Sequence, residues 1–101
     1  MKEDSFTSRC YKKLCAVPRG KVTTYKHLAR ALKSRAYRAV GQAMKNNPNA
    51  PKVPCHRVVL SNGKLGGYLG GTARKIKLLA QEGVTVQNGK VQDFKKHLHT
   101  F

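Results

Sequence analysis

The sequence predicts a small, mainly α-helical domain with a helix-turn-helix unit and one or two short β-hairpins. Apolar residues recur at helical spacing in several segments, which is the primary signal for helices. Two predicted helices are short and joined by Lys33-Ser34-Arg35, the proportions of a helix-turn-helix. The turn-forming pair Asn88-Gly89 lies between valines, which is typical of a β-hairpin. Because the sequence has 101 residues and no repeat or linker, we expect residues 1–101 to form one domain.

The first two helices are predicted from their apolar spacing and their end signals. The first spans residues 5–17 and ends at Pro18-Arg19-Gly20, because proline and glycine terminate helices. The second spans residues 24–33, and its expected N-cap is Thr24, whose hydroxyl can accept from a free backbone N–H. Their apolar positions are Phe6, Cys10, Leu14 and Val17, followed by Leu28, Ala29, Ala31 and Leu32.

The middle of the chain is predicted as a helix, an extended segment and a strand. The third helix spans residues 36–46 and ends before Pro48, because the residue preceding a proline disfavours the helical region. Three prolines predict an extended path over residues 48–54. A β-rich run over residues 56–60 then leads into the turn Ser61-Asn62-Gly63.

The last third of the chain is predicted as a flexible loop, two helices and the hairpin. Glycines surround Tyr68 and predict a loop there. Thr72 is the expected cap of a fourth helix, which Gly83 closes. Asp93 is the expected cap of a short final helix. The apolar positions of these two helices are Ile76, Leu79 and Ala80, then Phe94, Leu98 and Phe101.

The strongest feature of the composition is its charge. Lys and Arg total 21 against 4 acidic residues, a formal net charge of +17. Because self-repulsion of this size destabilises a compact chain, a polyanionic partner is its natural explanation. A solvated basic surface without a specific partner remains an alternative. No segment combines a bulky apolar face with a basic one, so the pattern favours nucleic acid over a membrane surface.

The cysteines and the absence of targeting signals predict an intracellular protein, in the cytoplasm, nucleoid or nucleus. Cys10, Cys15 and Cys55 cannot all form disulfides, and their spacing matches no zinc motif, so no metal site is expected. An odd thiol count suggests a reducing compartment. No apolar run is long enough for a membrane span, and the first fifteen residues do not resemble a signal peptide. We expect Cys10 and Cys15 to be core residues of the first helix.

The third predicted helix has the features of a DNA-reading helix. Three cations and an amide share the face opposite its apolar stripe: Arg35, Arg38, Gln42 and Lys45. Gly41 lowers helix propensity by roughly 1 kcal/mol relative to alanine, so a compensating close approach is expected. A slim helix of this kind suits the narrow minor groove. An ordinary solvated helix packed closely against a neighbour remains the alternative.

Cys55 and His56 form a candidate nucleophile and base. A thiol attacks carbon as thiolate, and at its ordinary pKa only a small fraction is ionised at neutral pH. His56 is adjacent, but neighbouring side chains in an extended segment point to opposite faces. Either the backbone turns at Cys55 or a water carries the proton. Of the four acids, Glu82 is best placed to orient the imidazole. A buried structural thiol and a core histidine remain plainer alternatives.

At this point the motifs resemble a known family. Pro54-Cys55-His56-Arg57-Val58 resembles the active-site motif of the O6-alkylguanine-DNA alkyltransferases, or methylated-DNA–protein-cysteine methyltransferases. The similarity covers roughly residues 5–86 and includes several separated motifs in the same order, which makes coincidence improbable. These further motifs are Arg38-Ala39-Val40-Gly41-Gln42-Ala43-Met44, Asn47-Pro48, Gly66 to Gly71, and Leu78-Leu79-Ala80-Gln81-Glu82-Gly83.

The resemblance implies a winged-helix-like domain, of the catalytic C-terminal type, which binds the DNA minor groove and flips out the damaged guanine. It implies that Cys55 is the alkyl acceptor and that His56 is its base, acting through a water. Glu82 then holds His56, and Asn47 braces the extended active-site segment. Tyr25 is implied to help rotate the nucleotide and to donate a proton toward the purine.

The resemblance also implies a DNA contact surface and a base pocket. Arg38 is implied to fill the place of the extruded base, a role that suits a long, planar side chain. The residues expected to contact DNA are Tyr25, Arg35, Tyr37, Arg38, Gly41, Gln42 and Lys45. Those expected to line the base pocket are Val58, Tyr68, Leu69, Gly70 and Lys75.

The implied reaction is direct reversal of O6-alkylguanine damage in double-stranded DNA. Transfer to Cys55 forms a thioether, which has no easy leaving route, so one turnover per molecule and no cofactor are expected. We expect a monomer with no membrane partner, and cooperative loading on DNA stays open. A non-catalytic lesion sensor that recruits other repair is the main alternative.

Two departures from the family pattern bear on that choice. Relatives usually carry an additional N-terminal domain, for which 101 residues leave no room. The family also has a short branch, the alkyltransferase-like proteins, which lacks the reactive cysteine, whereas this chain keeps Cys55. Leu69 stands where a small or polar residue is expected, which affects the substrate range. A general basic DNA-coating protein is a third interpretation.

Overall fold

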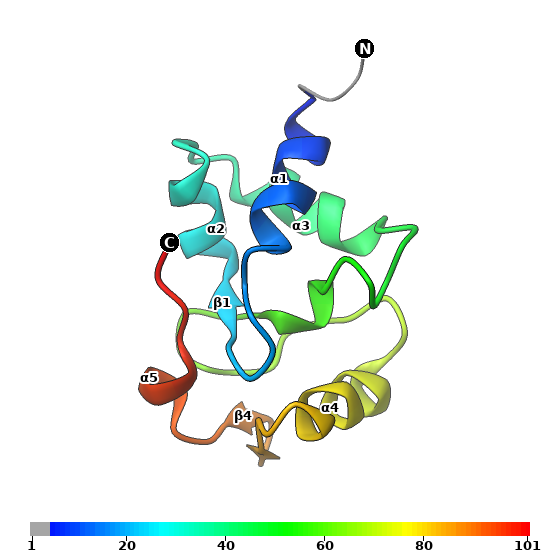
Figure 1. Ribbon diagram of the computed structural model, residues 1–101, viewed down its shortest axis with the longest axis vertical. Helices are drawn as coiled ribbons and strands as arrows, with labels where there is room; N and C mark the ends of the chain where they lie inside the picture. The colour runs from blue at the N-terminus through cyan, green and yellow to red at the C-terminus, as the bar shows by residue number, and fades with distance from the viewer. Residues whose placement is uncertain (1–4) are drawn as a thin grey trace.

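The computed structural model describes residues 5–101 (Figure 1). Helices carry most of the regular structure, which confirms the predicted mainly α, winged-helix-like class. The elements in chain order are α1 (Phe6–Leu14), β1 (Thr23–Thr24), α2 (Tyr25–Ala31), α3 (Tyr37–Lys45), the 3₁₀ turn η1 (Cys55–Arg57), β2 (Val58–Val59), α4 (Thr72–Gln81), β3 (Val86–Gln87), β4 (Lys90–Val91) and α5 (Phe94–His97).

The helices α1, α2 and α3 pack against one another and fill one end of the molecule (Figure 1). Thr24 caps α2, its side chain accepting from the backbone N–H of His27 at 2.9 Å, as predicted. Lys33, with φ 56°, makes the sharp turn between α2 and α3. These features confirm the predicted helix-turn-helix.

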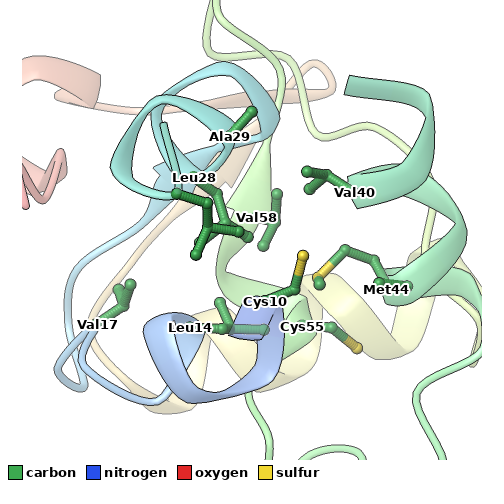
Figure 2. Close-up of a cluster of buried hydrophobic side chains, with 11 residues drawn as sticks. Cys10, Leu14, Val17, Leu28, Ala29, Val40, Met44, Cys55 and Val58 are labelled. Atoms are coloured by element: carbon green, nitrogen blue, oxygen red, sulfur yellow. The ribbon is translucent and has the colours of Figure 1, made fainter. Parts of the chain in front are cut away.

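The core consists of two clusters of buried apolar side chains. The larger lies among the three helices, and Figure 2 shows Cys10, Leu14, Leu28, Val40 and Met44 within it. The smaller lies beneath α4 and the hairpin, and its members are Val22, Val59, Leu65, Leu79, Val84 and Val91. Burying such apolar surface contributes roughly 25 cal/mol per Å² and supplies the main driving force for this fold.

The strands form two short pairs. β1 pairs with β2 in parallel, with Thr23 opposite Val58. The predicted run over residues 56–60 is wrong as a continuous strand, because its first residues form η1. The hairpin at Asn88-Gly89 is confirmed: β3 pairs with β4, and both turn residues have positive φ.

The predicted extended path over residues 48–54 is wrong. This segment folds into turns, in which the Val53 N–H donates to the Asn49 carbonyl at 2.9 Å. The cause is the Asn47 side chain, which accepts from the Asn49 N–H at 3.0 Å and donates to the Val53 carbonyl at 2.7 Å. Such side-chain bonds compete successfully with extended backbone.

Several end signals also differ from their predictions. α1 stops at Leu14, and Cys15, expected in the core, is exposed. Thr72 is the first residue of α4 rather than its cap, and Asp93 precedes α5 without a side-chain cap bond. Leu98 lies beyond α5 and forms an isolated β-bridge with Val22 instead of sharing a helical face. The predicted closure of α4 at Gly83, with φ +85°, is confirmed.

Candidate active site and nucleic-acid interface

A cavity of about 470 Å³ opens where α2, α3, η1 and the loop before α4 meet. This volume is typical of sites for small organic molecules, roughly 300–1,000 Å³. Its lining residues are Tyr25, Gly41, Met44, Lys45, Cys55, Gly67, Tyr68 and Leu69. The cavity therefore joins the predicted nucleophile, the predicted DNA-reading helix and the glycine-rich loop in one place.

Cys55 stands at the boundary between the core and this cavity. Its sulfur points away from the other labelled core side chains in Figure 2. The backbone turns here, since the Cys55 N–H donates to the Val53 carbonyl at 2.8 Å and opens the 3₁₀ turn. The backbone turn that the sequence left as one possibility is therefore present, and it leaves the other possibility, a bridging water, open.

His56 is directed toward Glu82 at the C-terminal end of α4, and its ring lies edge-on to that of Tyr68, with ring centroids 6.5 Å apart. It is 1% exposed, and its Nε2 lies 2.9 Å from Oε2 of Glu82. If Nε2 carries the proton that Glu82 accepts, Nδ1 is left with a lone pair. Nδ1 is buried and has no hydrogen-bond partner among the described residues. The imidazole is therefore oriented by a carboxylate and keeps a free basic nitrogen.

The carboxylate of Glu82 also binds Arg57. Arg57 donates from Nε to Oε1 and from Nη2 to Oε2, both at 2.9 Å, and from Nη1 to the Val17 carbonyl at 2.7 Å. Burial alone raises the pKa of Glu82, but the hydrogen bonds from Arg57 and His56 outweigh it and lower the pKa overall. Glu82 is thus an anion at neutral pH.

The protonation states of the two candidate catalytic groups follow from burial. Burial lowers the pKa of His56 below its ordinary value, although Glu82 acts in the opposite direction, so the imidazole is neutral at pH 7. Burial raises the pKa of the Cys55 thiol, although Asn47 and Lys75 act to lower it. Before reaction Cys55 is therefore a thiol and His56 a neutral base. Attack by a thiolate first requires a proton to leave Cys55.

Lys75 supports the cavity from behind. It is 0% exposed, and its Nζ donates to the carbonyls of Val58, Leu65 and Gly67 at 2.7, 2.6 and 2.9 Å. Burial lowers its pKa to about 8, although the nearby Cys55 acts in the opposite direction. Because Gly67 lines the cavity, the bond to its carbonyl lets Lys75 fix one wall of the cavity, although Lys75 itself does not line it.

The exposed face of α3 borders the cavity through Gly41 and Lys45. A Cβ at Gly41 would meet nothing within 4 Å, so the space above this residue is open. The other predicted DNA-contacting residues of α3 and the preceding turn, Arg35, Tyr37, Arg38 and Gln42, are exposed. Within residues 5–101 none of these cations forms an ion pair, so their charge remains available to a polyanion.

Comparison with known proteins agrees with this arrangement. The profile of the family "6-O-methylguanine DNA methyltransferase, DNA binding domain" matches residues 5–84. The chain belongs to this family. The methylated-DNA–protein-cysteine methyltransferase of Candida glabrata is 46% identical over 87 residues, which cover 85% of this chain and 42% of that protein. The human protein of the same name is 48% identical over 83 residues, covering 80% and 40%.

This alkyltransferase-family chain is also similar to solved structures of DNA complexes. Mycobacterium tuberculosis OGT in complex with DNA has a TM-score of 0.76 and 44% identity over 78% of this chain and 49% of that one. S. pombe Atl1, in complex with damaged DNA containing O6-carboxymethylguanine, has a TM-score of 0.84 and 31% identity, covering 100% of both chains. The chain spans about half or less of the methyltransferases it matches.

In this family member, the structure brings most predicted site residues together but not all. Cys55, Tyr25, Tyr68 and Leu69 line the cavity, and His56 and Glu82 stand behind it. The predicted pocket residues Val58, Gly70 and Lys75 lie outside its lining. Val58 and Lys75 are instead fully buried, and Gly70 is exposed.

Sequence reasoning missed two participants in the site. Met44 belongs to the quoted motif Arg38 to Met44, for which no pocket role is expected, yet it lines the cavity. Gly67, one of the glycines around Tyr68 that the resemblance places at the base pocket, forms part of the wall. Arg57 belonged to the quoted motif, but only its pairing with Glu82 in the fold shows its use. The sequence signal for this role of Arg57 is its position, as a basic residue directly after the Cys-His pair.

Two further observations concern metal binding and membrane spans. Among residues 5–101, no group of three or more His, Cys, Asp or Glu side chains lies close enough to bind a metal ion. No helix in the described part of the chain has the length and apolar character needed to span a membrane.

Proposed function

We propose that this chain repairs DNA by moving an alkyl group from O6 of guanine to Sγ of Cys55. The observation that carries the proposal is the position of Cys55, which lines a cavity of purine-compatible size and is followed in the chain by His56, whose imidazole Glu82 orients. Membership in the family, over residues 5–84, supports the same reaction. The proposed partner is double-stranded DNA, bound by a monomer inside the cell.

The proposed step begins with proton transfer away from the thiol. A water between Cys55 and the free Nδ1 of His56 relays the proton, because Nδ1 is buried and lacks a partner in the described chain. Glu82 accepts from Nε2 and stabilises the imidazolium that forms. Because burial lowers the pKa of His56, its imidazole is neutral at pH 7 and can accept this proton.

The thiolate then attacks the alkyl carbon of the flipped nucleotide. An S–C bond forms, the C–O6 bond breaks, and its electron pair remains on the purine oxygen. The departing guanine takes up one proton, for which Tyr25 is the proposed donor, since it lines the cavity and burial raises its pKa so that it stays protonated. The proton that Cys55 released to His56 then restores the Tyr25 hydroxyl by way of solvent. The net balance is one S–H and one C–O bond exchanged for one S–C and one N–H bond.

Access to the lesion requires extrusion of the nucleotide, at a cost of a few kcal/mol. We propose that α3 enters the minor groove and that the exposed Arg38 fills the vacated place in the stack. The open space above Gly41 supports this, since it lets the DNA approach the helix backbone beside the cavity. The thioether product leaves no free nucleophile, so each molecule acts once and needs no cofactor.

Intact-protein mass after incubation with an equimolar O6-methylguanine duplex tests the proposal. We expect one added methyl group, located by peptide mapping at Cys55. Cys55→Ser should abolish the adduct, whereas Cys15→Ser, at the exposed thiol, should leave it unchanged. An unmodified mass, or an adduct at Cys15, overturns the proposal.

A lesion sensor is the second candidate. The observation that favours it is the match to Atl1 over the whole of both chains. This function predicts selective binding of an O6-alkylguanine duplex without any change in protein mass, and binding that survives Cys55→Ala. The mass experiment separates the two candidates, because only the transferase acquires the methyl group.

A further inference from the structure

A second hollow, of about 510 Å³, lies between α1 and the C-terminal end of α2. Its residues divide into a basic rim and an apolar floor. The rim consists of Arg9, Lys12, Lys13 and Lys33, and the floor of Ala16, Ala31 and Leu32. We call this hollow the α1–α2 groove. It shares no lining residue with the cavity at Cys55.

The α1–α2 groove faces away from the helix proposed to bind DNA. On α1, Tyr11 contacts α3, its hydroxyl donating to the Ala43 carbonyl at 2.7 Å. The groove residues Arg9 and Lys13 are each two positions from Tyr11, which at about 100° per residue places them on the other side of α1. A duplex lying on the exposed face of α3 therefore leaves Arg9 and Lys13 uncovered, whereas Lys33 lies in the turn that leads to Arg35.

The charge of the groove is not neutralised within the described chain. Arg9 is held in place, since its Nη2 donates to the Leu32 carbonyl at 3.2 Å. The side chains of Lys12, Lys13 and Lys33 form no hydrogen bond or ion pair with any of residues 5–101. The acidic side chains in that range are Glu82, engaged by His56 and Arg57, and Asp93, beside α5.

Two helix C-termini meet at this groove, and each attracts cations. Lys12 and Lys13 occupy the last turn of α1, where cations interact favourably with the helix C-terminus. Lys33 follows the C-cap of α2, and Arg9 donates to the carbonyl of that cap, Leu32, so four cations converge around one hollow. A convergent basic rim is typical of a surface that binds an anionic partner.

We propose that the α1–α2 groove docks an acidic polypeptide segment of another protein while α3 is on DNA. The apolar floor decides between partner classes. Ala16, Ala31 and Leu32 can contact an aliphatic side chain, whereas a phosphodiester backbone would place charge against them. A segment that alternates carboxylates with aliphatic residues satisfies the rim and the floor together. This surface would link a lesion-bound molecule to a second protein, independently of alkyl transfer.

The test measures fluorescence anisotropy of a labelled peptide of glutamate and leucine, added to the full chain already saturated with an undamaged duplex. We expect binding to the protein–DNA complex without release of DNA. Lys12→Gln with Lys13→Gln should weaken peptide binding by about fivefold to tenfold, because two rim contacts are lost. Lys95→Gln with Lys96→Gln, a matched pair in α5, should change it less than about twofold.

Two further readouts keep the proposal falsifiable. Amide chemical shifts of the unmodified chain should move at Ala16, Ala31 and Leu32 on peptide addition, which requires no variant to fold. An all-glutamate peptide of equal charge should bind more weakly, because it leaves the floor empty. Equal weakening by both lysine pairs, shifts confined to α3, or displacement of the peptide by DNA each overturn the proposal.

Discussion

Oε2 of Glu82 lies 2.9 Å from Nε2 of His56, and the same carboxylate is held by two further hydrogen bonds from Arg57. Glu82 therefore has two roles. It positions His56, the proposed base, and through Arg57 it ties the C-terminal end of α4 to the active-site turn. The guanidinium fixes the carboxylate, and the carboxylate fixes the imidazole. His56, although adjacent to Cys55 in the sequence, is therefore oriented by a residue at the far end of α4.

The first prediction concerns the pH dependence of alkyl transfer. His56 has a pKa below its ordinary value of 6.5, so it is neutral at pH 7 and becomes protonated only in acid. The rate constant should therefore stay level as pH falls from 7.5 toward 6.5 and decline below that, as the base is lost. Single-turnover rates across this range check it. In His56→Ala the rate should instead rise toward high pH, because the pKa of Cys55 is raised above 9.0.

The second prediction concerns Glu82→Gln. The amide keeps the size of the side chain but loses the charge that orients and stabilises His56, so transfer should slow by about 10- to 100-fold. Affinity for the duplex should remain almost intact, because Glu82 stands behind the cavity rather than on α3. Asp93→Asn, at an exposed acid, provides the matched control. An unchanged rate in Glu82→Gln would assign the orientation of His56 to another group.

The third prediction concerns the buried Lys75. Replacement by Met removes three donors and leaves the carbonyls of Val58, Leu65 and Gly67 without them, so the free energy of unfolding should fall by about 2 kcal/mol. Transfer should also slow, because Gly67 lines the cavity. Lys77→Met, on the exposed side of the same helix, should change stability by less than about 0.5 kcal/mol. Urea titration of both variants compares them, and equal stability would refute the anchoring role.

The fourth prediction concerns the exposed Arg38. If its side chain fills the stack behind an extruded base, Arg38→Ala should slow repair in duplex DNA more than in single-stranded DNA, where no stack has to be filled. Lys45→Ala removes the same charge from the same helix and serves as the control for simple phosphate attraction. Second-order rate constants on both substrates give the comparison. Equal losses for Arg38→Ala on the two substrates would contradict the role.

Local patterns were sufficient to predict the helix-turn-helix and much of the site. Apolar spacing located α1, α2 and α3, and Thr24 and Asn88-Gly89 act through neighbouring backbone, so their effects follow from sequence. The resemblance supplied roles for Cys55 and Glu82, and the structure places one in the cavity and the other against His56.

What sequence could not predict depends on contacts between distant segments. β1 and β2 are two residues each, too short to show a period, and only their pairing creates them. Asn47 folds residues 48–52 because its side chain reaches Val53. The resemblance places Lys75 in the lining of the base pocket, but its burial behind the cavity follows from three carbonyls that β2 and the loop before α4 present.

The last prediction separates helix stability from DNA approach at Gly41. A Cβ there meets nothing within 4 Å, so Gly41→Ala should be accommodated without a clash and should raise the free energy of unfolding by up to about 1 kcal/mol, because alanine is the better helix former. The same methyl group would stand at the edge of the cavity, on the surface proposed to enter the minor groove, and should weaken duplex binding. Ala39→Gly, at an exposed position of α3, should have the reverse effect on stability and little effect on affinity. Thermal melts and duplex titrations of both variants decide the matter: a Gly41→Ala chain that is more stable and binds DNA as tightly as before would mean that α3 does not approach the groove at this residue.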